Sequence, residues 1–572
     1  MEENTEDYLL EVRKPARYIG REFNSVVKKI NSNTFNIVLC FPDAYEVGMS
    51  HLGIKVLYHI LNKQEEVFCQ RCFAPWLDME ELMRKRNLPL LSLESQRPLS
   101  DFDVLGFSLQ YELGFTNVLN MLELGGIPIY AKDRAGLPIV IAGGPCCYNP
   151  EPMAEFIDVF VIGEAEEVII ELVNKCREFK KSFEDLPEAE SLSQREKLLR
   201  ELAKIEGVYV PTFTETPKRI TRRYVENFEE TEVPTAPPVP FVEVIHDRIS
   251  LEIMRGCPNQ CYFCQAGFTI NPVRMRSVDK VLELAKKTYR NTGFEKIAFC
   301  ALSSANYPNL KKLITQMHSF CRERGLGISL PSLRIDKDFS EILAMIGDLK
   351  KTGLTFAPEA GSERLRKLIN KNIDIQSLKD AVLAAHKIGW KKLKLYFMIG
   401  LPTEDNEDLE NIVSLVKEFT YLRKSVDSRL GQINVSISNF IPKAHTPFQW
   451  LGMNTPEELA AKQQYLRSRL SAKNLKVSFH DVRMSFLEAY LTRGDRQLHK
   501  VIFKAYTSGA RFDAWSESFN FALWQEAFKE HDIDPRQYVC QKRDISQDLP
   551  WEYIDCGIPS EVLRDALRKS GI

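Results

Sequence analysis

The chain of 572 residues lacks a long apolar run. No uninterrupted stretch approaches the ~18–20 apolar residues that a membrane-spanning helix requires, so the sequence predicts no membrane partner. The first residues, MEENTEDYLLEV, are acidic, whereas a secretory signal has a basic stretch followed by an apolar one. We therefore expect a cytoplasmic protein.

The chain also lacks an excess of charge of either sign. Its 76 basic and 78 acidic residues give a formal net charge of −2. This balance does not predict a dominant non-specific grip on nucleic-acid phosphates, although a local basic face remains open. The 13 cysteines are an odd number in a large chain, which argues against a disulfide framework. We expect reduced thiols, some of which can bind metal.

Residues 34–175 alternate short apolar runs with helical patterns. Short buried strands that alternate with helices indicate a parallel sheet with helices on its faces. The pattern predicts an α/β fold in which residues 1–232 form a Rossmann-like parallel-sheet domain with a charged helical extension. The expected elements are strands at 36–42, 104–109, 138–144 and 158–163 and a helix at 54–62.

A second series of strands and helices follows a proline-rich stretch, VPTAPPVPF, within residues 233–242. Four prolines in nine residues suit a semi-rigid linker. Six β–α repeats predict a partial (β/α)6 barrel over residues 243–453, with its chemistry at the carboxyl ends of the strands. Residues 454–572 are expected to form a mainly helical C-terminal region. The expected barrel strands are 249–254, 296–302, 327–333, 354–360, 392–400 and 433–440.

Three cysteines stand at C-x3-C-x2-C spacing directly after the first barrel strand, in RGCPNQCYFCQAG (255–267). Thiolates are the usual ligands of iron–sulfur clusters, and a 4Fe–4S cube takes four ligands. Cys257, Cys261 and Cys264 would leave one iron open to another ligand, as catalytic metal sites require. The alternatives are a zinc knuckle and three buried thiols, but the next twenty residues offer zinc no fourth Cys or His.

This motif resembles the signature of the radical S-adenosylmethionine (radical SAM) superfamily, and the resemblance covers residues 245–450. It implies an enzyme with a 4Fe–4S cluster on Cys257, Cys261 and Cys264, and with SAM on the fourth iron. It also implies reductive cleavage of SAM with electrons from a donor such as flavodoxin or ferredoxin. Phe263 resembles the aromatic residue that lies against the adenine in this superfamily.

Other strand ends resemble SAM-binding positions of the superfamily. Arg334 corresponds to an arginine that meets the SAM carboxylate, Glu359 to an acidic residue that faces the ribose or amino group, and Gly400 to a glycine beside adenine. The alternatives are a surface arginine, a helix-starting carboxylate and a turn glycine. CALSSANY (300–307) departs from the usual Gly-Gly-Glu run, so Ser303, Ser304 or Asn306 would have to replace it.

Residues 34–175 resemble the cobalamin-binding domain that precedes one branch of radical SAM enzymes, which includes methyltransferases and a ring-forming enzyme of chlorophyll biosynthesis. The resemblance implies cobalamin contacts at His51, Ser108, Gly143 and Gly144, which follow different strands of one parallel sheet. The loop around His51 departs from the familiar Asp-x-His-x-x-Gly pattern, so helix capping and surface solvation remain alternatives.

Three hypotheses follow. The first is a radical SAM enzyme that uses cobalamin, for example as a methyltransferase. The second is a radical SAM enzyme without cobalamin whose N-terminal domain docks the substrate. The third is a non-enzymatic iron–sulfur sensor or scaffold, which polar residues at many barrel strand ends disfavour. RNA, a protein and a small molecule all remain open as the substrate. We expect the C-terminal region to close the barrel mouth.

Overall fold

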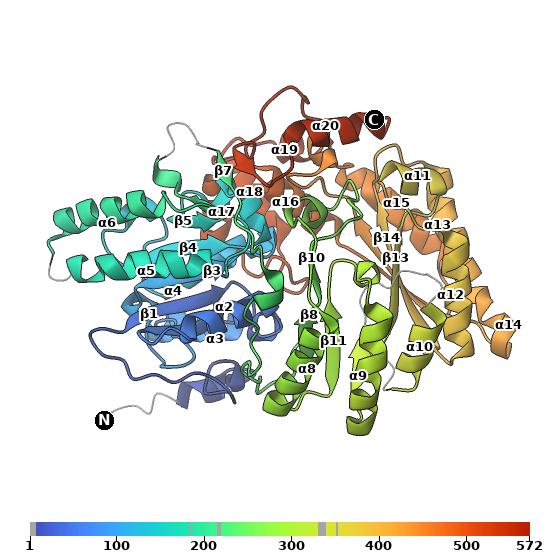
Figure 1. Cartoon of the computed structure of the whole chain (residues 1–572). Helices are drawn as coiled ribbons and strands as arrows, with labels where there is room; N and C mark the ends of the chain where they lie inside the picture. The colour runs from blue at the N-terminus through green and yellow to red at the C-terminus, as the bar shows by residue number, and fades with distance from the viewer. Residues whose placement is uncertain (1–6, 184–185, 214–218, 330–338, 350–352) are drawn as a thin grey trace. The chain divides into compact units, whose positions relative to one another are not determined.

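The computed structural model of the chain describes residues 7–183, 186–213, 219–329, 339–349 and 353–572 (Figure 1). The chain forms two compact units, each built from three separate segments. The first unit contains Met1–Asp247, Gly494–Asp534 and Leu549–Asp555. The second contains Arg248–Arg493, Pro535–Asp548 and Cys556–Ile572. The structure thus differs from the expected C-terminal region at 454–572, because that stretch is divided between the two units.

The first unit is built on a six-stranded sheet with the order β2-β1-β3-β4-β5-β6. All neighbours are parallel except β5 and β6. The order 2-1-3-4-5 is that of a doubly wound α/β fold, which confirms the predicted class. The strands are β1 (Phe35–Phe41), β2 (Val67–Phe73), β3 (Val104–Ser108), β4 (Ile139–Gly143), β5 (Val159–Val161) and β6 (Val208–Tyr209).

Strand β2 is absent from the sequence prediction because it carries Gln70 and Arg71 at its centre. Both side chains are buried, and Arg71 forms ion pairs with Glu22 at 2.8 Å and Glu94 at 2.6 Å. Helices cover both faces of the sheet, as buried parallel strands require. These helices are α1 (Tyr45–Gly48), α2 (Leu52–Asn62), α3 (Leu77–Arg86), α4 (Phe115–Leu124), α5 (Val168–Lys180) and α6 (Glu188–Leu202).

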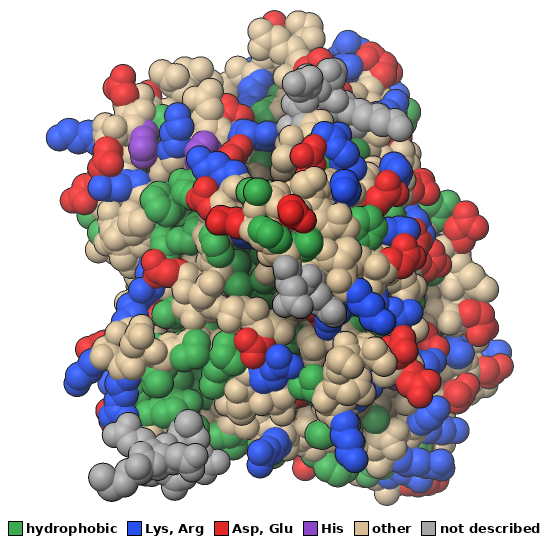
Figure 2. Space-filling model, turned by 90° about the vertical axis from the view of Figure 1, so that its left-hand side faces the viewer, with side chains coloured by type: hydrophobic (Ala, Val, Ile, Leu, Met, Phe, Trp, Pro, Cys, Tyr) green, Lys and Arg blue, Asp and Glu red, His purple; other side chains and the backbone are tan. Residues whose placement is uncertain are grey.

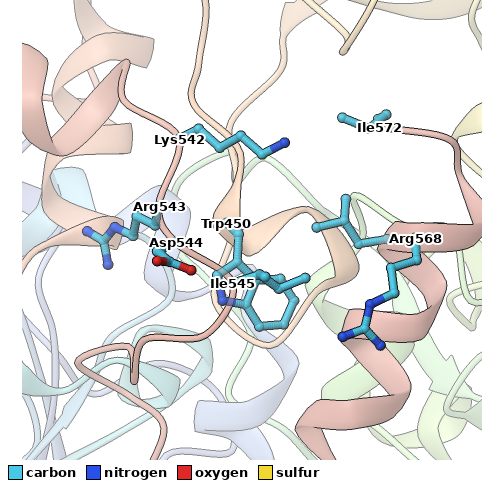
Figure 3. A pocket seen from close by; sticks show the side chains of 8 residues that line it. Trp450, Lys542, Arg543, Asp544, Ile545, Arg568 and Ile572 are labelled. Atoms are coloured by element: carbon cyan, nitrogen blue, oxygen red, sulfur yellow. The ribbon is translucent and has the colours of Figure 1, made fainter.

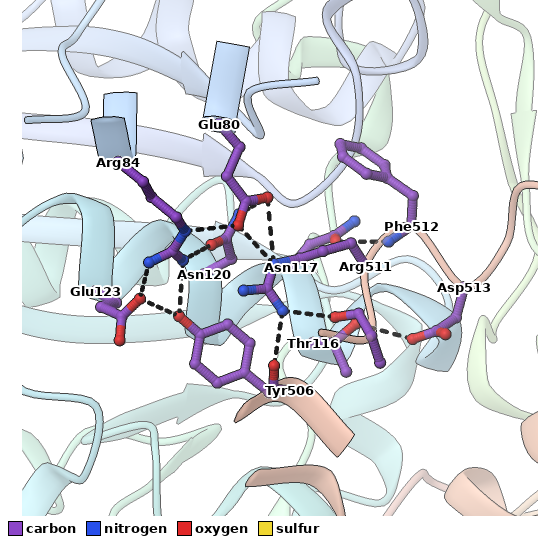
Figure 4. A network of polar contacts seen from close by, with 11 residues as sticks. Glu80, Arg84, Thr116, Asn117, Asn120, Glu123, Tyr506, Arg511, Phe512 and Asp513 are labelled. Atoms are coloured by element: carbon purple, nitrogen blue, oxygen red, sulfur yellow. Dashed lines mark hydrogen bonds and ion pairs between the residues drawn. The ribbon is translucent and has the colours of Figure 1, made fainter. Parts of the chain in front are cut away.

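A segment from the C-terminal part of the chain completes the first unit through α17 (Leu498–Thr507) and α18 (Phe521–Glu530). Figure 4 shows the polar network that fixes this segment to α3 and α4. The Arg511 guanidinium donates to both carboxylate oxygens of Glu80, at 3.0 and 3.2 Å. Thr116 donates to Asp513, and the backbone N–H of Phe512 donates to Asn117. The segment is therefore an integral part of this unit.

A second polar cluster joins three distant stretches of the same unit around Glu151. The hydroxyls of Tyr209 and Tyr553 donate to Glu151 at 2.8 and 2.6 Å, and Arg496 pairs with its other oxygen at 3.0 Å. Nearby, β17 (Ile554–Asp555) pairs in parallel with β7 (Ile220–Thr221). The stretches around RGDR (493–496) and LPWEYIDCG (549–557) thus have a structural role here.

The second unit contains two parallel sheets, with the orders β12-β11-β8 and β13-β14-β15-β16. The six predicted barrel strands are present, and β16 adds a seventh that the sequence prediction had assigned to the helical C-terminal region. The strands are β8 (Ile249–Glu252), β11 (Lys296–Cys300), β12 (Gly327–Ser329), β13 (Leu354–Glu359), β14 (Lys392–Ile399), β15 (Gln432–Asn439) and β16 (Leu475–Phe479).

Helices flank the strands of the second unit (Figure 1). Several have clear start signals, such as the capping box in which Asp405 and Asp408 satisfy each other's backbone N–H groups at the start of α13. The helices are α7 (Gln265–Thr269), α8 (Val278–Thr292), α9 (Leu310–Arg324), α10 (Phe339–Gly347), α11 (Glu363–Leu368), α12 (Ile375–Lys387), α13 (Asn406–Leu422), α14 (Lys424–Asp427), α15 (Pro456–Arg469), α16 (Val482–Arg493), α19 (Pro535–Val539) and α20 (Ser560–Lys569).

The surface agrees with the balanced composition. Figure 2 shows one face on which basic and acidic side chains are interspersed with hydrophobic ones. Among the described residues, no helix is both long and apolar enough to cross a membrane.

Candidate active site

The three cysteines lie on a loop that leaves the barrel after β8 and returns before α8. Its ends are closed by the antiparallel pair β9 (Met254–Arg255) and β10 (Arg274–Met275). Gly256, at the start of the loop, has φ +89°, and a Cβ there would lie 2.8 Å from the carbonyl oxygen of Ile270. The turn into the cysteine motif therefore requires glycine at this position.

The loop after α11 holds the cysteine loop in place. The Tyr262 N–H donates to the carbonyl oxygen of Ile369 at 3.0 Å, and the Asn370 side chain donates to the carbonyls of Asn259 and Gln260. These contacts fix the backbone around the cysteines without using their thiols. The thiols of Cys257, Cys261 and Cys264 are all free.

The three thiols interact with one another, and an iron–sulfur cluster can use them at separate positions. Burial raises the pKa of Cys261 to about 12 and raises that of Cys264, and the two thiols and Cys257 interact electrostatically with one another. Among the described residues, no three His, Cys, Asp or Glu side chains converge closely enough for a single metal ion. In a 4Fe–4S cube the thiolates bind different irons, so they do not have to converge on one point.

A carboxylate and an ammonium lie beside these thiols. Glu359, at the end of β13, has φ +66° and pairs with Lys371 at 3.4 Å. Burial raises the pKa of Glu359, and Lys371 opposes that shift. Burial by itself lowers the pKa of Lys371. Glu359 and the thiols of Cys261 and Cys264 outweigh this effect and raise the pKa above its ordinary value. The structure therefore places Glu359 and Lys371 together beside the cysteines.

The polar residues after β11 contact the cysteine loop through Asn259. The Asn259 amide donates to Ser303 Oγ at 3.4 Å and to Asn306 Oδ1 at 3.3 Å, and Ser303 donates to Asn306 at 2.6 Å. Ser304 is fully buried, and its hydroxyl has no hydrogen-bond partner in the part of the chain that the structure describes. A buried hydroxyl without a partner is costly unless a ligand satisfies it. In the stretch that replaces the Gly-Gly-Glu run, the Ser304 hydroxyl is thus available to bond a ligand.

The remaining predicted SAM residues have different surroundings. Gly400 has φ +78°, and a Cβ there would lie 2.8 Å from Leu459 and 3.2 Å from Asn454. Its N–H donates to Glu404 at 2.7 Å, and Glu404 pairs with Lys462. Gly400 thus serves as a turn glycine, which was one of the alternatives. Phe263 is half-buried within the cysteine motif. Arg334 lies outside the described residues.

The four predicted cobalamin residues lie around the carboxyl ends of β1, β3 and β4. The strand order reverses between β1 and β3, and in open α/β sheets ligands bind at such a switch point. Gln110, which the sequence analysis did not single out, donates to Ser108 Oγ at 2.8 Å and is hydrogen-bonded to His51. A Cβ on Gly144, with φ +118°, would lie 2.5 Å from the Leu109 oxygen and 3.0 Å from Gln110.

His51 has a local structural role. Its Nδ1 accepts from the N–H of Ile54 at 3.3 Å and so caps α2, which was one of the alternatives. Burial lowers the pKa of His51 to about 4, so the imidazole is neutral at neutral pH. Gly143 has more space than Gly144, because the nearest atom to a Cβ there would be Val161 Cβ at 3.9 Å.

The C-terminal segment also contributes to this edge of the first unit. Trp515 Nε1 donates to Asp43, in the loop after β1, at 2.8 Å. Trp515 packs edge-on against Trp76, which follows β2, with 5.1 Å between ring centroids. Burial raises the pKa of Asp43 to about 6. Residues of GARFDAW (509–515) therefore belong to the neighbourhood of the predicted ligand edge, which no local sequence signal indicated.

A separate cavity of about 550 Å³ lies in the second unit, between Trp450 and the last helix (Figure 3). Lys542, Arg543 and Arg568 line it, together with apolar side chains. None of the predicted site residues lines this cavity.

Comparisons with known proteins agree with this geometry. The family model described as "Radical SAM superfamily" matches residues 251–416, and "Radical SAM proteins, N-terminal" matches residues 53–211. An uncharacterized protein of Methanocaldococcus jannaschii is 30% identical over 473 residues, covering 82% of this chain and 90% of its own. The chain belongs to the radical SAM superfamily.

As a member of this superfamily, the radical SAM protein is an enzyme, and the enzymes of the superfamily use a 4Fe–4S cluster and SAM. The anaerobic magnesium-protoporphyrin IX monomethyl ester cyclase of Cereibacter sphaeroides is 25% identical over 272 residues, covering 45% of this chain and 40% of its own. The solved structure of the radical SAM methyltransferase TsrM from Kitasatospora setae, with cobalamin and a [4Fe–4S] cluster bound, aligns with a TM-score of 0.52. That alignment covers 94% of this chain and 99% of TsrM at 13% identity, a likeness of fold.

Proposed function

We propose that this protein holds a 4Fe–4S cluster on Cys257, Cys261 and Cys264 and binds SAM beside it, and that it modifies its substrate with the help of cobalamin, as a methyltransferase or related enzyme. The observation that carries the proposal is the grouping of three unpaired thiols with Lys371 and Glu359. When bound and reduced by a donor such as flavodoxin or ferredoxin, the cluster supplies the electron that cleaves SAM to a 5′-deoxyadenosyl radical.

The side chains around the thiols suit the polar groups of SAM. The Lys371 ammonium offers a cation for the SAM carboxylate, and Glu359 offers an acceptor for the amino group or the ribose hydroxyls. The Ser304 hydroxyl, which has no partner among the described residues, offers one more hydrogen bond after β11, the strand beside β8. Because Lys371 and Glu359 already pair at 3.4 Å, their charges are held in place before SAM arrives.

Iron and sulfide analysis tests the cluster ligands. Cys257→Ala, Cys261→Ala and Cys264→Ala, each reconstituted anaerobically, should lose the cluster, since two thiolates hold a cube poorly. Cys540→Ala is the matched control, because Cys540 is a half-buried free thiol outside the motif and should keep its iron. If a motif variant keeps about four irons per chain and still converts SAM to 5′-deoxyadenosine, the assignment is wrong.

The cobalamin part of the proposal rests on the edge formed by the ends of β1, β3 and β4. Ser108 and Gln110 present polar atoms there, while Gly143 and Gly144 leave the backbone bare for a flat ligand. His51 caps α2 with Nδ1, so the proposal does not require it as a cobalt ligand. TsrM, which shares the fold, was solved with cobalamin bound.

Equilibrium dialysis of the full chain with hydroxocobalamin tests this part. Gly143→Val adds a side chain at the edge where a Cβ meets nothing closer than 3.9 Å, so the variant should fold and lose cobalamin. Gly144→Val is a poorer test, because its Cβ would collide with the Leu109 backbone. Gly353→Val, in the second unit, has nothing within 4 Å of the added Cβ and no left-handed backbone to strain, so it should retain binding. No retention by the wild-type chain would leave the second hypothesis, a docking domain without cobalamin.

A further inference from the structure

One face of the β13–β16 sheet in the second unit is polar and carries lysines. The other face is buried on β14, where Leu393, Leu395 and Phe397 are at 1% exposure or less, as expected for the face that α12 and α13 cover. Residues between these positions point the opposite way, because side chains alternate along a strand. The alternate face carries Lys392, Lys394, Asn434, Ser436, Lys476 and Ser478, all half-buried or exposed.

This composition is unusual for the interior of a β/α barrel. A closed barrel fills its interior with layers of branched apolar side chains. Here the register aligns Lys394 with Asn434 and Lys476 across three adjacent strands, and Tyr396 with Ser436 and Ser478 one level higher. A polar layer of this kind does not form a packed core. It leaves a wall that can meet a polar ligand.

The charge of this wall is one-sided. Glu359 is the only acidic residue in the four strands, and it is paired with Lys371. Among the described residues, Lys394 has no carboxylate partner, and its ammonium lies over the Tyr396 ring at 4.6 Å from the centroid. Arg248, just before β8, has a buried Nε that finds no hydrogen-bond partner among the described residues. The second unit therefore presents at least one lysine, Lys394, that no carboxylate in its described part neutralises.

Edge protection does not account for the whole pattern. Lys476 lies on β16 at the edge of the sheet, where lysines commonly prevent edge-to-edge association. Lys392 and Lys394, however, lie on β14, which is paired on both sides. A lysine on a central strand facing away from the helices has no such function. A ligand with negative charge is the simplest counterpart for it.

We propose that this face, centred on Lys394 and Lys476, binds the phosphates of a single-stranded nucleic acid as the substrate of the reaction proposed above. Lys394 and Lys476 are two strands apart, so their backbones stand ~10 Å from each other. That separation exceeds the size of one phosphate and suits successive phosphates of a strand. Asn434 and Ser436 add hydrogen-bonding groups, and Tyr396 adds an aromatic ring on which a base can stack.

The position of the face connects it to the cluster. Lys394 stands five residues before Ile399, the end of β14, a rise of ~16 Å along the strand. Glu359 lies at the same carboxyl end of the neighbouring strand. A nucleic-acid strand held by the lysines can therefore extend along the face toward the ends where the radical chemistry is proposed. The lysines act as positioning residues in this arrangement.

Fluorescence anisotropy with a labelled short single-stranded RNA of mixed sequence tests the proposal on the full chain. The measurement needs neither cluster nor SAM, so its failure is distinct from a failure of iron binding or SAM cleavage. The wild-type protein should bind the RNA with an affinity that falls steeply with salt. Lys394→Gln and Lys476→Gln should each weaken binding several-fold and lower the slope of log K against log salt by about 0.7.

The matched control is Lys417→Gln, which removes an exposed lysine from the outer surface of α13 and should change neither affinity nor slope. Circular dichroism confirms that the variants fold, since glutamine at half-buried or exposed positions should not unfold them. A nucleoside monophosphate should compete weakly, because it offers a single phosphate. No RNA binding, equal effects of all three substitutions, or equal competition by polyglutamate would overturn the proposal.

Discussion

The contact between Arg511 and Glu80 gives the sharpest test of how the first unit is assembled. Both side chains are nearly buried, at 10% and 9% exposure. Arg511 also donates to the carbonyls of Tyr506 and Ala510 and lies over the Tyr506 ring at 4.2 Å. Arg511→Met keeps most of the volume but removes the charge and every hydrogen bond. We expect it to loosen the segment 494–534 from the sheet.

The magnitude follows from what Glu80 retains. Removing one partner of a buried ion pair typically costs 3–5 kcal/mol, because the other charge stays buried. Glu80 still accepts from Arg84 and Asn120, both at 2.9 Å, so the loss should fall at the lower end, about 3 kcal/mol. For a unit of this size, that corresponds to a fall of about 5 °C in the unfolding midpoint.

Thermal unfolding followed by fluorescence, together with limited proteolysis, measures the effect. Early cleavage within 494–534 should accompany the lower midpoint, since that segment loses its anchor. Arg568→Met is the control, because Arg568 is 57% exposed and its pairs with Glu561 and Asp565 contribute little. A midpoint within about 2 °C of the wild type, or equal to that of the control, would refute the reasoning.

Three further predictions concern single residues. Lys371→Met should keep its iron yet bind SAM about tenfold more weakly by isothermal calorimetry, with Lys371→Arg restoring part of the affinity and the exposed Lys367→Met as control. Gly256→Ala should lose iron on reconstitution, because its Cβ would meet the Ile270 oxygen at 2.8 Å, whereas Gly293→Ala has open space and should not. Burial raises the pKa of Asp513 to about 6, above its unfolded value of 3.8, so stability should be full below pH 4 and fall by about 3 kcal/mol as pH rises through 6. Denaturant unfolding from pH 4 to 7 measures this, and Asp513→Asn should make the free energy of unfolding depend less on pH. If the pH dependence of Asp513→Asn equals that of the wild type, the prediction is wrong.

The features that the sequence predicted are those with a local signal. The cysteine motif lies within eight residues of one loop, and the apolar strands β1, β3, β4 and β5 each stand as a short run between turns. Strand β2 was not predicted because Arg71 interrupts its apolar pattern. Ion pairs with the distant Glu22 and Glu94 allow that arginine to be buried in the sheet. Pattern alone does not reveal partners so far away.

The same limit applies to the candidate site. Glu359 could be predicted from its position at a strand end, but Lys371 lies in the loop after α11 and reaches the thiols only through the fold. Likewise, Gln110 has no motif of its own, and its importance comes from joining Ser108 to His51. His51 was ambiguous for a physical reason, since a histidine before a helix can cap the helix or bind a metal.

The interleaving of the two units follows from the same long-range pairing. Within the first unit, Glu80, Glu151 and Asp43 belong to the N-terminal segment, and each has a partner after residue 493: Arg511, Arg496 and Trp515, respectively. A buried carboxylate is costly without partners, and a chain that ended at the barrel would remove at least one partner from each of these three groups, although Glu80 would keep Arg84 and Glu151 would keep Tyr209. The motifs RGDR and GARFDAW thus supply hydrogen-bond donors to carboxylates some 350 to 470 residues earlier in the chain. The residues next to each motif do not predict these contacts. The partners of each motif lie in the distant N-terminal segment and not in the helices beside the motif.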